Sequence, residues 1–342
     1  MKNYTLKVEN IRKETEDTLT LCFKQPGLRK IKYQAGQYLT LSFRIEGRKY
    51  TRAYSFSSSP SIDSFLEVTI KRVPNGKVSN YIHDFLKVGD IVEVLEPMGD
   101  FVFDANSQTK TIYFWGAGSG ITPLMAMIKE ILFSNQTIQL NLIYGNKTLE
   151  SVIFLDKIKE LESLYPKQFK VFHFLSQQNN ADQENIFQGR INTAFIETLL
   201  KDNDSKDTLH YICGSDGLKK TIKTVLNQIQ FPESAIYSED FELIIDPSAF
   251  EGIEDRAVKI NFLEKETQIE VLKGKNVLEA ALDNNMELPY SCQTGSCSTC
   301  KATLLEGKMK MIGLEKPRTD LNQDEFLLCC SYPLTEDIYI KV

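Results

Sequence analysis

The stretch TIYFWGAGSGITPL, residues 111–124, decides the fold of the middle of this chain. An apolar run typical of a buried strand leads into three glycines. Thr122 and Pro123 then suit the start of a helix, whose first turn Thr122 can cap. A strand, a glycine-rich turn and a helix in this order begin a parallel sheet covered by helices. The stretch is not the G-x-G-x-x-G fingerprint, because Ile121 holds the place of the third glycine.

Strands and helices continue to alternate after this stretch, so residues 107–237 are predicted to form an α/β domain with a parallel sheet. Free N–H groups at helix starts can bind a pyrophosphate, which makes this a nucleotide-binding architecture by pattern. The expected strands are 111–116, 138–145, 169–176 and 209–214, and the expected helices are 122–132, 149–165, 193–201 and 217–229.

Upstream, residues 1–106 run in short alternating segments separated by turn residues such as Pro74-Asn75-Gly76. This pattern predicts an antiparallel β-barrel or sandwich with one short helix at 78–86. The alternating segments are YLTLSFRI, TRAYSFSSS, LEVTIKRV and IVEVLEP, at residues 38–45, 51–59, 66–73 and 91–97.

Downstream, residues 238–255 hold seven acidic residues and no Lys or Arg. We expect an exposed linker that is extended by its own charge repulsion, with a docking surface as the alternative. Residues 256–342 then combine a hairpin, a short helix at 276–285 and later strands at 301–307 and 338–342, which predicts a small α+β domain.

This α+β domain holds five of the seven cysteines, spaced as C-x4-C-x2-C in LPYSCQTGSCSTCKATLLEG (288–307) and adjacent in FLLCCSYP (326–333). Plant-type ferredoxins hold a [2Fe-2S] cluster with the first of these spacings. Gly295 and its small neighbours would let the main chain approach the cluster sulfides closely. A zinc site and buried free thiols are the alternatives, although structural zinc sites favour paired C-x2-C hooks.

The composition is that of a folded, multi-domain protein, with 42% hydrophobic and 25% charged residues in 342. A net charge of -6 without a basic block argues against a nucleic-acid partner. The N-terminus has no apolar core of signal-peptide type, and no run of 18 apolar residues occurs. We therefore expect no membrane insertion and a cytoplasmic location.

Several motifs, taken together and in order, make the chain similar to the ferredoxin-NADP reductase superfamily with a C-terminal plant-type ferredoxin domain. They are Arg52-Ala53-Tyr54-Ser55, Gly76-Lys77-Val78-Ser79, residues 116–123, Cys213-Gly214-Ser215 and the two cysteine segments. The order of the domains, with the ferredoxin last, resembles the reductases of phenylacetyl-CoA epoxidase and of related oxygenases and hydroxylases. The resemblance covers essentially the whole chain. It implies an antiparallel β-barrel that binds FAD, an α/β parallel-sheet domain that binds NAD(P) and an α+β β-grasp ferredoxin domain.

By this resemblance, Arg52 neutralises the FAD pyrophosphate, Tyr54 lies against the isoalloxazine ring and Ser55 hydrogen-bonds near the ring nitrogen that accepts hydride. Strand alternation puts Ser55 on the face opposite Arg52 and Tyr54 unless the strand bends. A second phosphate-binding segment is implied at a helix start. Its residues are Gly76, Lys77, Val78 and Ser79.

The resemblance also implies a pyridine-nucleotide site with Cys213 beside the nicotinamide, a buried structural thiol being the alternative. Tyr54, Ser55 and Cys213 are thus the expected catalytic residues. Family members often carry Arg where this chain has Lys147 and Gln177, so NADPH, which is slightly preferred, and NADH both remain open. The other nucleotide-binding residues are implied to be Gly116, Gly118, Gly120, Thr122, Pro123 and Gly214.

For the cluster, the implied ligands are Cys292, Cys297, Cys300 and Cys329. Cys329 is preferred because two residues separate it from Tyr332-Pro333, as in ferredoxins. This choice leaves 28 residues after Cys300, one fewer than the family spacing, which Cys330 would restore. The intervening stretch MIGLEKPRTDLNQDE, residues 311–325, is interpreted as a loop that tolerates deletion.

These parts predict an NAD(P)H:acceptor oxidoreductase in which hydride passes to FAD and single electrons then pass to the cluster. The acceptor is expected to be a separate oxygenase, hydroxylase or desaturase, because the sequence has no carboxylate-histidine di-iron pattern of its own. The alternatives are an electron-transfer subunit of a larger complex and a reductase of a quinone or a small iron chelate.

Overall fold

The computed structural model describes residues 2–27, 30–104, 109–134, 137–178, 184–201, 207–243, 245–314 and 317–342. The chain divides into two compact units: Met1–Leu41 with Tyr54–Glu239, and Ser42–Ala53 with Asp240–Val342. The expected domain boundary between residues 106 and 107 lies outside the described residues. Within the described part of the chain, every helix is too short or too polar to span a bilayer.

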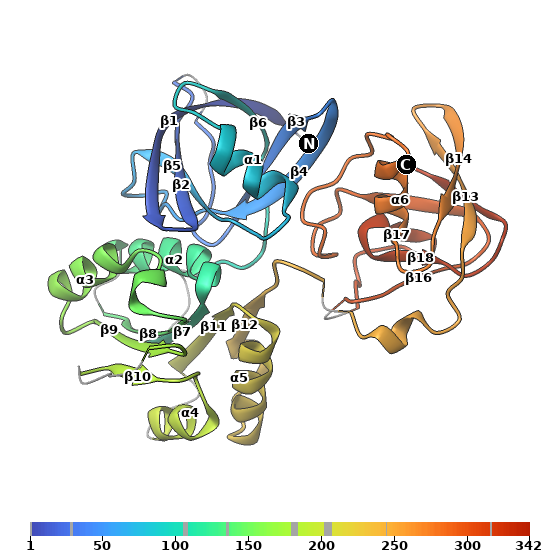
Figure 1. Cartoon of the computed structure of the whole chain (residues 1–342). Helices are drawn as coiled ribbons and strands as arrows, with labels where there is room; N and C mark the ends of the chain where they lie inside the picture. Colours follow the sequence, from blue (N-terminus) through green and yellow to red (C-terminus); the bar gives the residue numbers. More distant parts are fainter. Residues whose placement is uncertain are drawn as a thin grey trace. The chain divides into compact units, whose positions relative to one another are not determined.

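The N-terminal strands form a six-stranded sheet in the order β4-β3-β6-β1-β2-β5 (Figure 1). The pairs β1–β2, β1–β6 and β2–β5 are antiparallel, which confirms the expected antiparallel class. The helix α1 (Lys77–Phe85) follows β5 and buries Val78 and Ile82. The strands are β1 (Asn3–Thr15), β2 (Thr18–Lys24), β3 (Tyr38–Ile45), β4 (Arg48–Ser55), β5 (Phe65–Lys71) and β6 (Ile91–Leu95).

Strand β4 begins and ends earlier than the expected segment 51–59. Phe56 follows the strand, its N–H donates to the Gln37 carbonyl at 2.9 Å, and it forms an isolated bridge with Val68 of β5. Its side chain is fully buried. Ser55 is therefore the last residue of the strand.

The central residues form a parallel sheet in the order β10-β9-β8-β7-β11-β12, as the alternating pattern predicts. Its strands are β7 (Thr111–Ala117), β8 (Gln139–Asn146), β9 (Phe169–Leu175), β10 (Ile186–Gln188), β11 (Thr208–Cys213) and β12 (Ile236–Glu239). Helices α2 (Ile121–Ser134) and α3 (Leu155–Leu164) pack into one core, while α4 (Thr193–Leu200) and α5 (Asp216–Gln228) pack into another. The order along the sheet reverses between β7 and β11, and ligands of such sheets bind at the carboxyl ends of the strands at this point.

The helix expected over residues 149–165 is interrupted. A single 3₁₀ turn at Leu149–Ser151 precedes α3, which starts only at Leu155. Between them Val152, Ile153 and Phe154 are buried in the core, and Phe154 has a left-handed φ of 65°. Burial of these three consecutive apolar side chains requires the chain to leave the helical path.

The C-terminal residues form a sheet in the order β14-β13-β19-β15-β17, with a separate β16–β18 pair. The pair β13–β19 is parallel and its neighbours are antiparallel, while α6 (Val277–Asp283) packs into the same core, as expected for a β-grasp ferredoxin domain. The strands are β13 (Arg256–Phe262), β14 (Lys265–Val271), β15 (Lys301–Glu306), β16 (Met309–Met311), β17 (Glu325–Leu327), β18 (Ser331–Pro333) and β19 (Ile338–Lys341).

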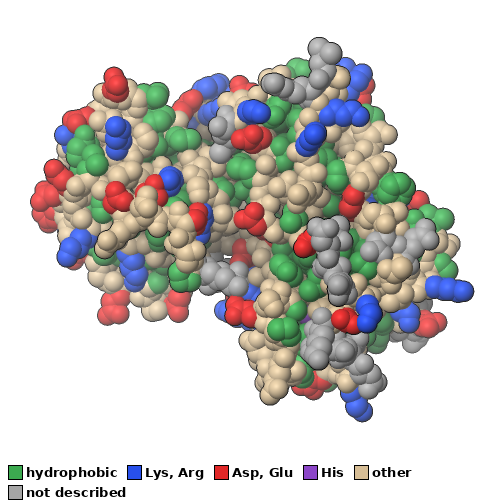
Figure 2. Space-filling model, turned by 180° about the vertical axis from the view of Figure 1, so that it is seen from behind, with side chains coloured by type: hydrophobic (Ala, Val, Ile, Leu, Met, Phe, Trp, Pro, Cys, Tyr) green, Lys and Arg blue, Asp and Glu red, His purple; other side chains and the backbone are tan. Residues whose placement is uncertain are grey.

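Part of the acidic segment packs against the expected cluster-binding domain. Within the second unit, Ile253 is buried against Ile312 and Tyr332, and the Phe250 ring meets the Tyr332 ring edge-on with 5.2 Å between centroids. Apolar side chains among the acidic ones therefore anchor this part of the segment. Figure 2, which shows the face opposite that of Figure 1, has basic and acidic side chains interspersed with apolar ones.

Candidate functional site

The nucleotide-binding motif lies at the reversal point between β7 and β11. Gly116 pairs with Cys213 across the two strands. A Cβ on Gly120 would lie 2.1 Å from the Cys213 carbonyl oxygen and 2.8 Å from the Gly214 nitrogen, so only glycine permits this approach. The structure therefore brings the glycine turn and the Cys213-Gly214 segment together.

The start of α2 offers N–H groups to an anion. No acidic residue lies in its first turn, and the preceding 3₁₀ turn has no side-chain cap. Thr122 does not cap it as expected, since its hydroxyl donates to the Ser119 carbonyl at 3.0 Å instead of accepting from an N–H. Thr122 and Pro123 are both buried in the helix. This donor set fits a diphosphate, which helix N-termini bind through N–H groups and the helix dipole.

Cys213 is buried at the end of β11. Burial raises the pKa of the Cys213 thiol well above its usual value, and the Glu239 carboxylate adds to this rise. The thiol therefore stays neutral, so it can form an apolar wall of a site but does not act as a nucleophile.

The flavin motif occupies the end of β4. Arg52 and Tyr54 are half-buried and Ser55 is buried. Arg52 Nη1 donates to the Thr51 carbonyl at 2.8 Å, while its other guanidinium N–H groups leave donors for a phosphate.

The second phosphate motif forms the start of α1. Gly76 is its N-cap without a side-chain cap, and no acidic residue lies in the first turn. A Cβ on Gly76 would lie 2.6 Å from Ser79 Oγ, which accepts from the Val73 N–H at 3.1 Å. Lys77 is the first helical residue and Val78 is buried. A free helix N-terminus with an adjacent Lys fits an anionic diphosphate.

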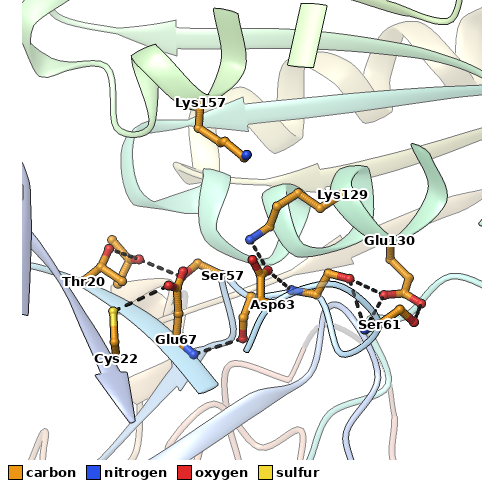
Figure 3. A network of polar contacts seen from close by, with 12 residues as sticks. Thr20, Cys22, Ser57, Ser61, Asp63, Glu67, Lys129, Glu130 and Lys157 are labelled. Atoms are coloured by element: carbon orange, nitrogen blue, oxygen red, sulfur yellow. Dashed lines mark hydrogen bonds and ion pairs between the residues drawn. The ribbon is translucent and has the colours of Figure 1, made fainter. Parts of the chain in front are cut away.

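A polar network joins the barrel to α2 within the first unit (Figure 3). Lys129 is 5% exposed and its ammonium contacts Asp63 Oδ2 at 2.5 Å, while Asp63 also accepts from the Ser59 N–H at 2.6 Å. Next along α2, Glu130 accepts from the hydroxyls of Ser59 and Ser61. The loop after β4 is thereby tied to the helix that carries the nucleotide motif.

The same network continues along a cleft of about 530 Å³. There Arg12 donates to both carboxylate oxygens of Glu67 at 3.2 Å, and the Cys22 thiol donates to Glu67 at 3.5 Å. Burial, and then the Glu67 charge, raises the pKa of Cys22 to about 12. Cys22 is therefore an unreactive thiol, and these charges serve the structure.

The four expected cluster ligands come together in the second unit. Cys292 Sγ accepts hydrogen bonds from the N–H groups of Thr294 and Cys297, both at 3.4 Å. The thiols of Cys297 and Cys329 donate to the same sulfur and lower the pKa of Cys292. The Cys329 thiol also lowers the pKa of Cys300 by hydrogen bonding.

The sulfur contacts form a chain, because Cys292 contacts both Cys297 and Cys329, and Cys329 also contacts Cys300. Among the described residues, no three His, Cys, Asp or Glu side chains gather closely enough around one point to hold a single metal ion. In a [2Fe-2S] cluster each iron takes two thiolates. The contacts of Cys292 with Cys297 and of Cys300 with Cys329, together with main-chain donors and a left-handed Gly295, fit such a cluster.

Cys330 has a different environment from Cys329. Its side chain is fully buried and its thiol donates to the Leu327 carbonyl at 3.4 Å. The sulfurs of Cys292 and Cys300 contact the Cys329 side chain, which also contacts Cys330. Cys329 thus contacts two of the other expected ligands, Cys292 and Cys300, and both Cys329 and Cys330 are buried in the same core.

Sequence reasoning missed Arg318, which lies in the stretch interpreted as a loop that tolerates deletion. Its guanidinium donates to the carbonyls of Gly295 at 2.6 Å and Cys297 at 3.4 Å and to Ser298 Oγ at 2.9 Å. The Asp320 carboxylate holds the guanidinium and raises the pKa of Arg318. The available signal was an Arg-x-Asp pair inside a loop between cluster ligands.

Comparison with known protein families gives a match in each part of the chain. An oxidoreductase FAD-binding domain matches residues 5–103, an oxidoreductase NAD-binding domain matches residues 114–224, and a 2Fe-2S iron-sulfur cluster binding domain matches residues 260–334. These three matches agree with the cofactors expected from the sequence.

Similar curated proteins match along nearly the whole chain. The ferredoxin reductase component of 3-ketosteroid-9-alpha-monooxygenase from Rhodococcus rhodochrous is 30% identical, covering 99% of this chain and 97% of the relative. A component of the 1,2-phenylacetyl-CoA epoxidase from Escherichia coli (strain K12) is 28% identical, covering 98% and 97%. Among solved structures, phthalate dioxygenase reductase has the same fold, with a TM-score of 0.70 at 21% identity over 99% of this chain and 98% of that one.

Proposed function

The chain belongs to the family of oxygenase reductase components with FAD-binding, NAD-binding and [2Fe-2S] domains. We propose that it passes electrons from NAD(P)H to a separate oxygenase, hydroxylase or desaturase component. The protein is an NAD(P)H oxidoreductase that uses FAD and an iron-sulfur cluster. FAD accepts an electron pair as hydride from a nicotinamide, whereas a [2Fe-2S] cluster accepts one electron at a time. The cytoplasmic location expected from the sequence is part of the proposal.

The observation that carries this proposal is the gathering of Cys292, Cys297, Cys300 and Cys329 around one site. These residues come from two segments that are separated by 28 positions. Hydrophobic packing alone does not require four neighbouring cysteines, so their contact points to a shared ligand. The main-chain N–H groups of Thr294 and Cys297 would stabilise thiolate charge, and Arg318 would hold the loop in place.

For FAD, the proposal assigns the diphosphate to Arg52 and to the uncapped start of α1 with Gly76, Lys77, Val78 and Ser79. Tyr54 would pack against the flavin ring, and the Ser55 hydroxyl would donate near the ring nitrogen that receives hydride. The buried position of Ser55 supports this role, because exclusion of water strengthens such a hydrogen bond.

For NAD(P)H, the proposal assigns the diphosphate to the turn with Gly116, Gly118 and Gly120 and to the start of α2 with Thr122 and Pro123. Cys213 and Gly214 would form the wall beside the nicotinamide, and the neutral Cys213 thiol would exclude water there. Lys147 and Gln177 are hydrogen-bonded neighbours through their main chains, and both NADPH and NADH remain candidate donors.

Coupled turnover tests the acceptor. The purified holoprotein with NAD(P)H is expected to support product formation by a purified oxygenase component, and to reduce a quinone or a ferric chelate much more slowly. Fast turnover with the small acceptors and none with oxygenase components would contradict the proposal.

A further inference from the structure

Strand β4 is the edge strand of its sheet, and both peptide groups of Thr51 on this strand are bound by side chains of the cluster-binding loop. Within the second unit, the Thr51 N–H donates to the Tyr290 hydroxyl at 2.8 Å, and Gln293 Nε2 donates to the Thr51 carbonyl at 3.3 Å. Thr51 and Tyr290 are both buried. Edge strands usually leave such groups to water or cover them deliberately.

Gln293 lies in a backbone conformation that glycine would suit better. Its φ is 60°, in the left-handed region, as is the φ of Gly295 two residues later at 73°. The geometry of the loop alone would therefore favour glycine at both positions. What glutamine adds at position 293 is the side-chain amide that reaches Thr51.

Two ion pairs lie beside this contact. Arg44 contacts Glu287 at 2.9 Å and Arg48 contacts Asp283 at 3.0 Å. Their side chains are 30–60% exposed, so water screens them and they contribute little. The buried hydrogen bonds to Thr51 are therefore the specific part of the contact.

We infer that Tyr290 and Gln293 are positioning residues that hold the cluster-binding loop on strand β4 and so set the rate at which electrons reach the cluster; this rests on the proposed function. Thr51 directly precedes Arg52 on β4, and Tyr290 and Gln293 flank Cys292. A short covalent stretch and two hydrogen bonds thus join the flavin motif to a cluster ligand.

In each turnover two electrons must pass across this contact, one after the other. Oxidation of one NAD(P)H to NAD(P)⁺ releases one proton and two electrons. A flavin held at strand β4 would pass these electrons to the cluster one at a time, and each would then leave to a one-electron acceptor protein.

The test uses holoprotein variants that keep the surrounding packing. Tyr290→Phe removes only the hydroxyl, and Gln293→Gly removes the amide while relieving the left-handed backbone. Tyr339→Phe is the matched control, because its hydroxyl on β19 donates to Glu266 at 2.7 Å and does not contact the loop. Anaerobic stopped-flow absorbance separates flavin reduction from cluster reduction, and hydrogen exchange measures protection of the Thr51 amide.

In the Tyr290→Phe and Gln293→Gly variants, we expect unchanged flavin reduction by NAD(P)H. Cluster reduction should slow by about fivefold for each hydrogen bond removed, and the double variant should be slowest. Thr51 should exchange faster in Tyr290→Phe, and the cluster's paramagnetic resonance spectrum should stay as in the wild type. Tyr339→Phe should behave like the wild type.

The inference is overturned if the double variant reduces its cluster at the wild-type rate, or if Thr51 exchange does not change in Tyr290→Phe. If the double variant loses its cluster, the same two measurements are applied to the single variants. A wild-type rate of cluster reduction in both, or unchanged Thr51 exchange in Tyr290→Phe, then overturns the inference. A wild-type protein that reduces neither flavin nor cluster would instead contradict the proposed function, so the two failures are distinguishable.

Discussion

At the scale of single residues, Cys329 and Cys330 are neighbours for which we predict different roles. Cys329 contacts Cys292 and Cys300, whereas the Cys330 thiol donates to a main-chain carbonyl in the core. We expect Cys329→Ser to lose the cluster and keep FAD, and Cys330→Ser to keep both. Iron, acid-labile sulfide and visible absorption of each purified variant measure this. Loss of the cluster in Cys330→Ser but not in Cys329→Ser would refute the assignment.

Gly120 tests the nucleotide turn. An alanine Cβ would lie 2.1 Å from the Cys213 carbonyl oxygen, so Gly120→Ala must push the turn away from β11. Overpacking of this kind costs about 1–3 kcal/mol, which predicts a kcat/KM for NAD(P)H that is about 5- to 150-fold lower, with FAD and cluster content unchanged.

The control for this variant is Gly217→Ala in α5, where an added Cβ meets nothing within 4 Å. It should leave kcat/KM unchanged. Equal effects of the two substitutions would contradict the role given to Gly120.

His210 is predicted to make the stability of the α/β domain depend on pH. It is fully buried, and burial lowers the pKa of His210 to about 3, while burial and then Lys159 lower the pKa of His173 to about 4. Both are neutral when folded and take up a proton on unfolding below about pH 6.5. Stability should therefore fall as the pH drops from about 6.5 towards 3–4, by at most about 1.4 kcal/mol per pH unit for each histidine.

Urea unfolding followed through Trp115 measures this effect, because the indole N–H of this single tryptophan donates to His210 Nδ1 at 3.1 Å. His210→Gln keeps an acceptor and should make the pH dependence about half as steep over this range, because His173 still contributes. An equally steep dependence in the variant would exclude His210 as a source.

At the scale of elements, the ion pair between α2 and the loop after β4 should stabilise the first unit (Figure 3). Lys129→Ala would leave the Asp63 carboxylate with only main-chain support. Loss of one partner of a buried pair costs about 3–5 kcal/mol, and the 25% exposure of Asp63 places the expected loss at the lower end.

The matched control is Lys157→Ala, which breaks an exposed i,i+3 pair with Glu160 and should change the free energy of unfolding by about 0.5 kcal/mol or less. Urea unfolding through Trp115 compares the two variants. A similar small effect for both would show that the Lys129–Asp63 pair does not join these elements.

Elements with a strong local signal were predictable from the sequence. The strand-glycine-helix order at 111–124 and the hairpin of β13 and β14 depend on periodicity and turn residues that the sequence displays directly. Strands β10 and β12 have three and four residues and form only because a neighbouring strand is present, so no local pattern indicates them. Tertiary burial likewise broke the helix expected over 149–165 at Phe154.

The residues of the candidate site likewise fall into those that the sequence indicates and those that only the fold reveals. The spacing of Cys292, Cys297 and Cys300 carries their chemistry within one short segment, so the sequence indicates them directly. Arg318 and Tyr290 act through contacts with residues distant in sequence, and their types alone do not indicate a role. The preference for Cys329 over Cys330 could be argued from spacing, but the different surroundings of their sulfurs emerge only in the fold.

At the scale of the whole molecule, three matched domains in one chain make a converter from two-electron to one-electron transfer. The acceptor in this account is a separate component, as in the oxygenase systems whose reductase components this chain is similar to. Removing the cluster should therefore abolish delivery to an oxygenase while leaving hydride acceptance intact.

Anaerobic stopped-flow mixing of the holoprotein with NADPH or NADH, with flavin and cluster absorbance followed separately, tests this account most directly. We predict that the flavin band bleaches first and the cluster band second in the wild type, and that only the flavin band bleaches in Cys329→Ser. A cluster that is reduced before the flavin, or a flavin that neither nucleotide bleaches, would contradict it.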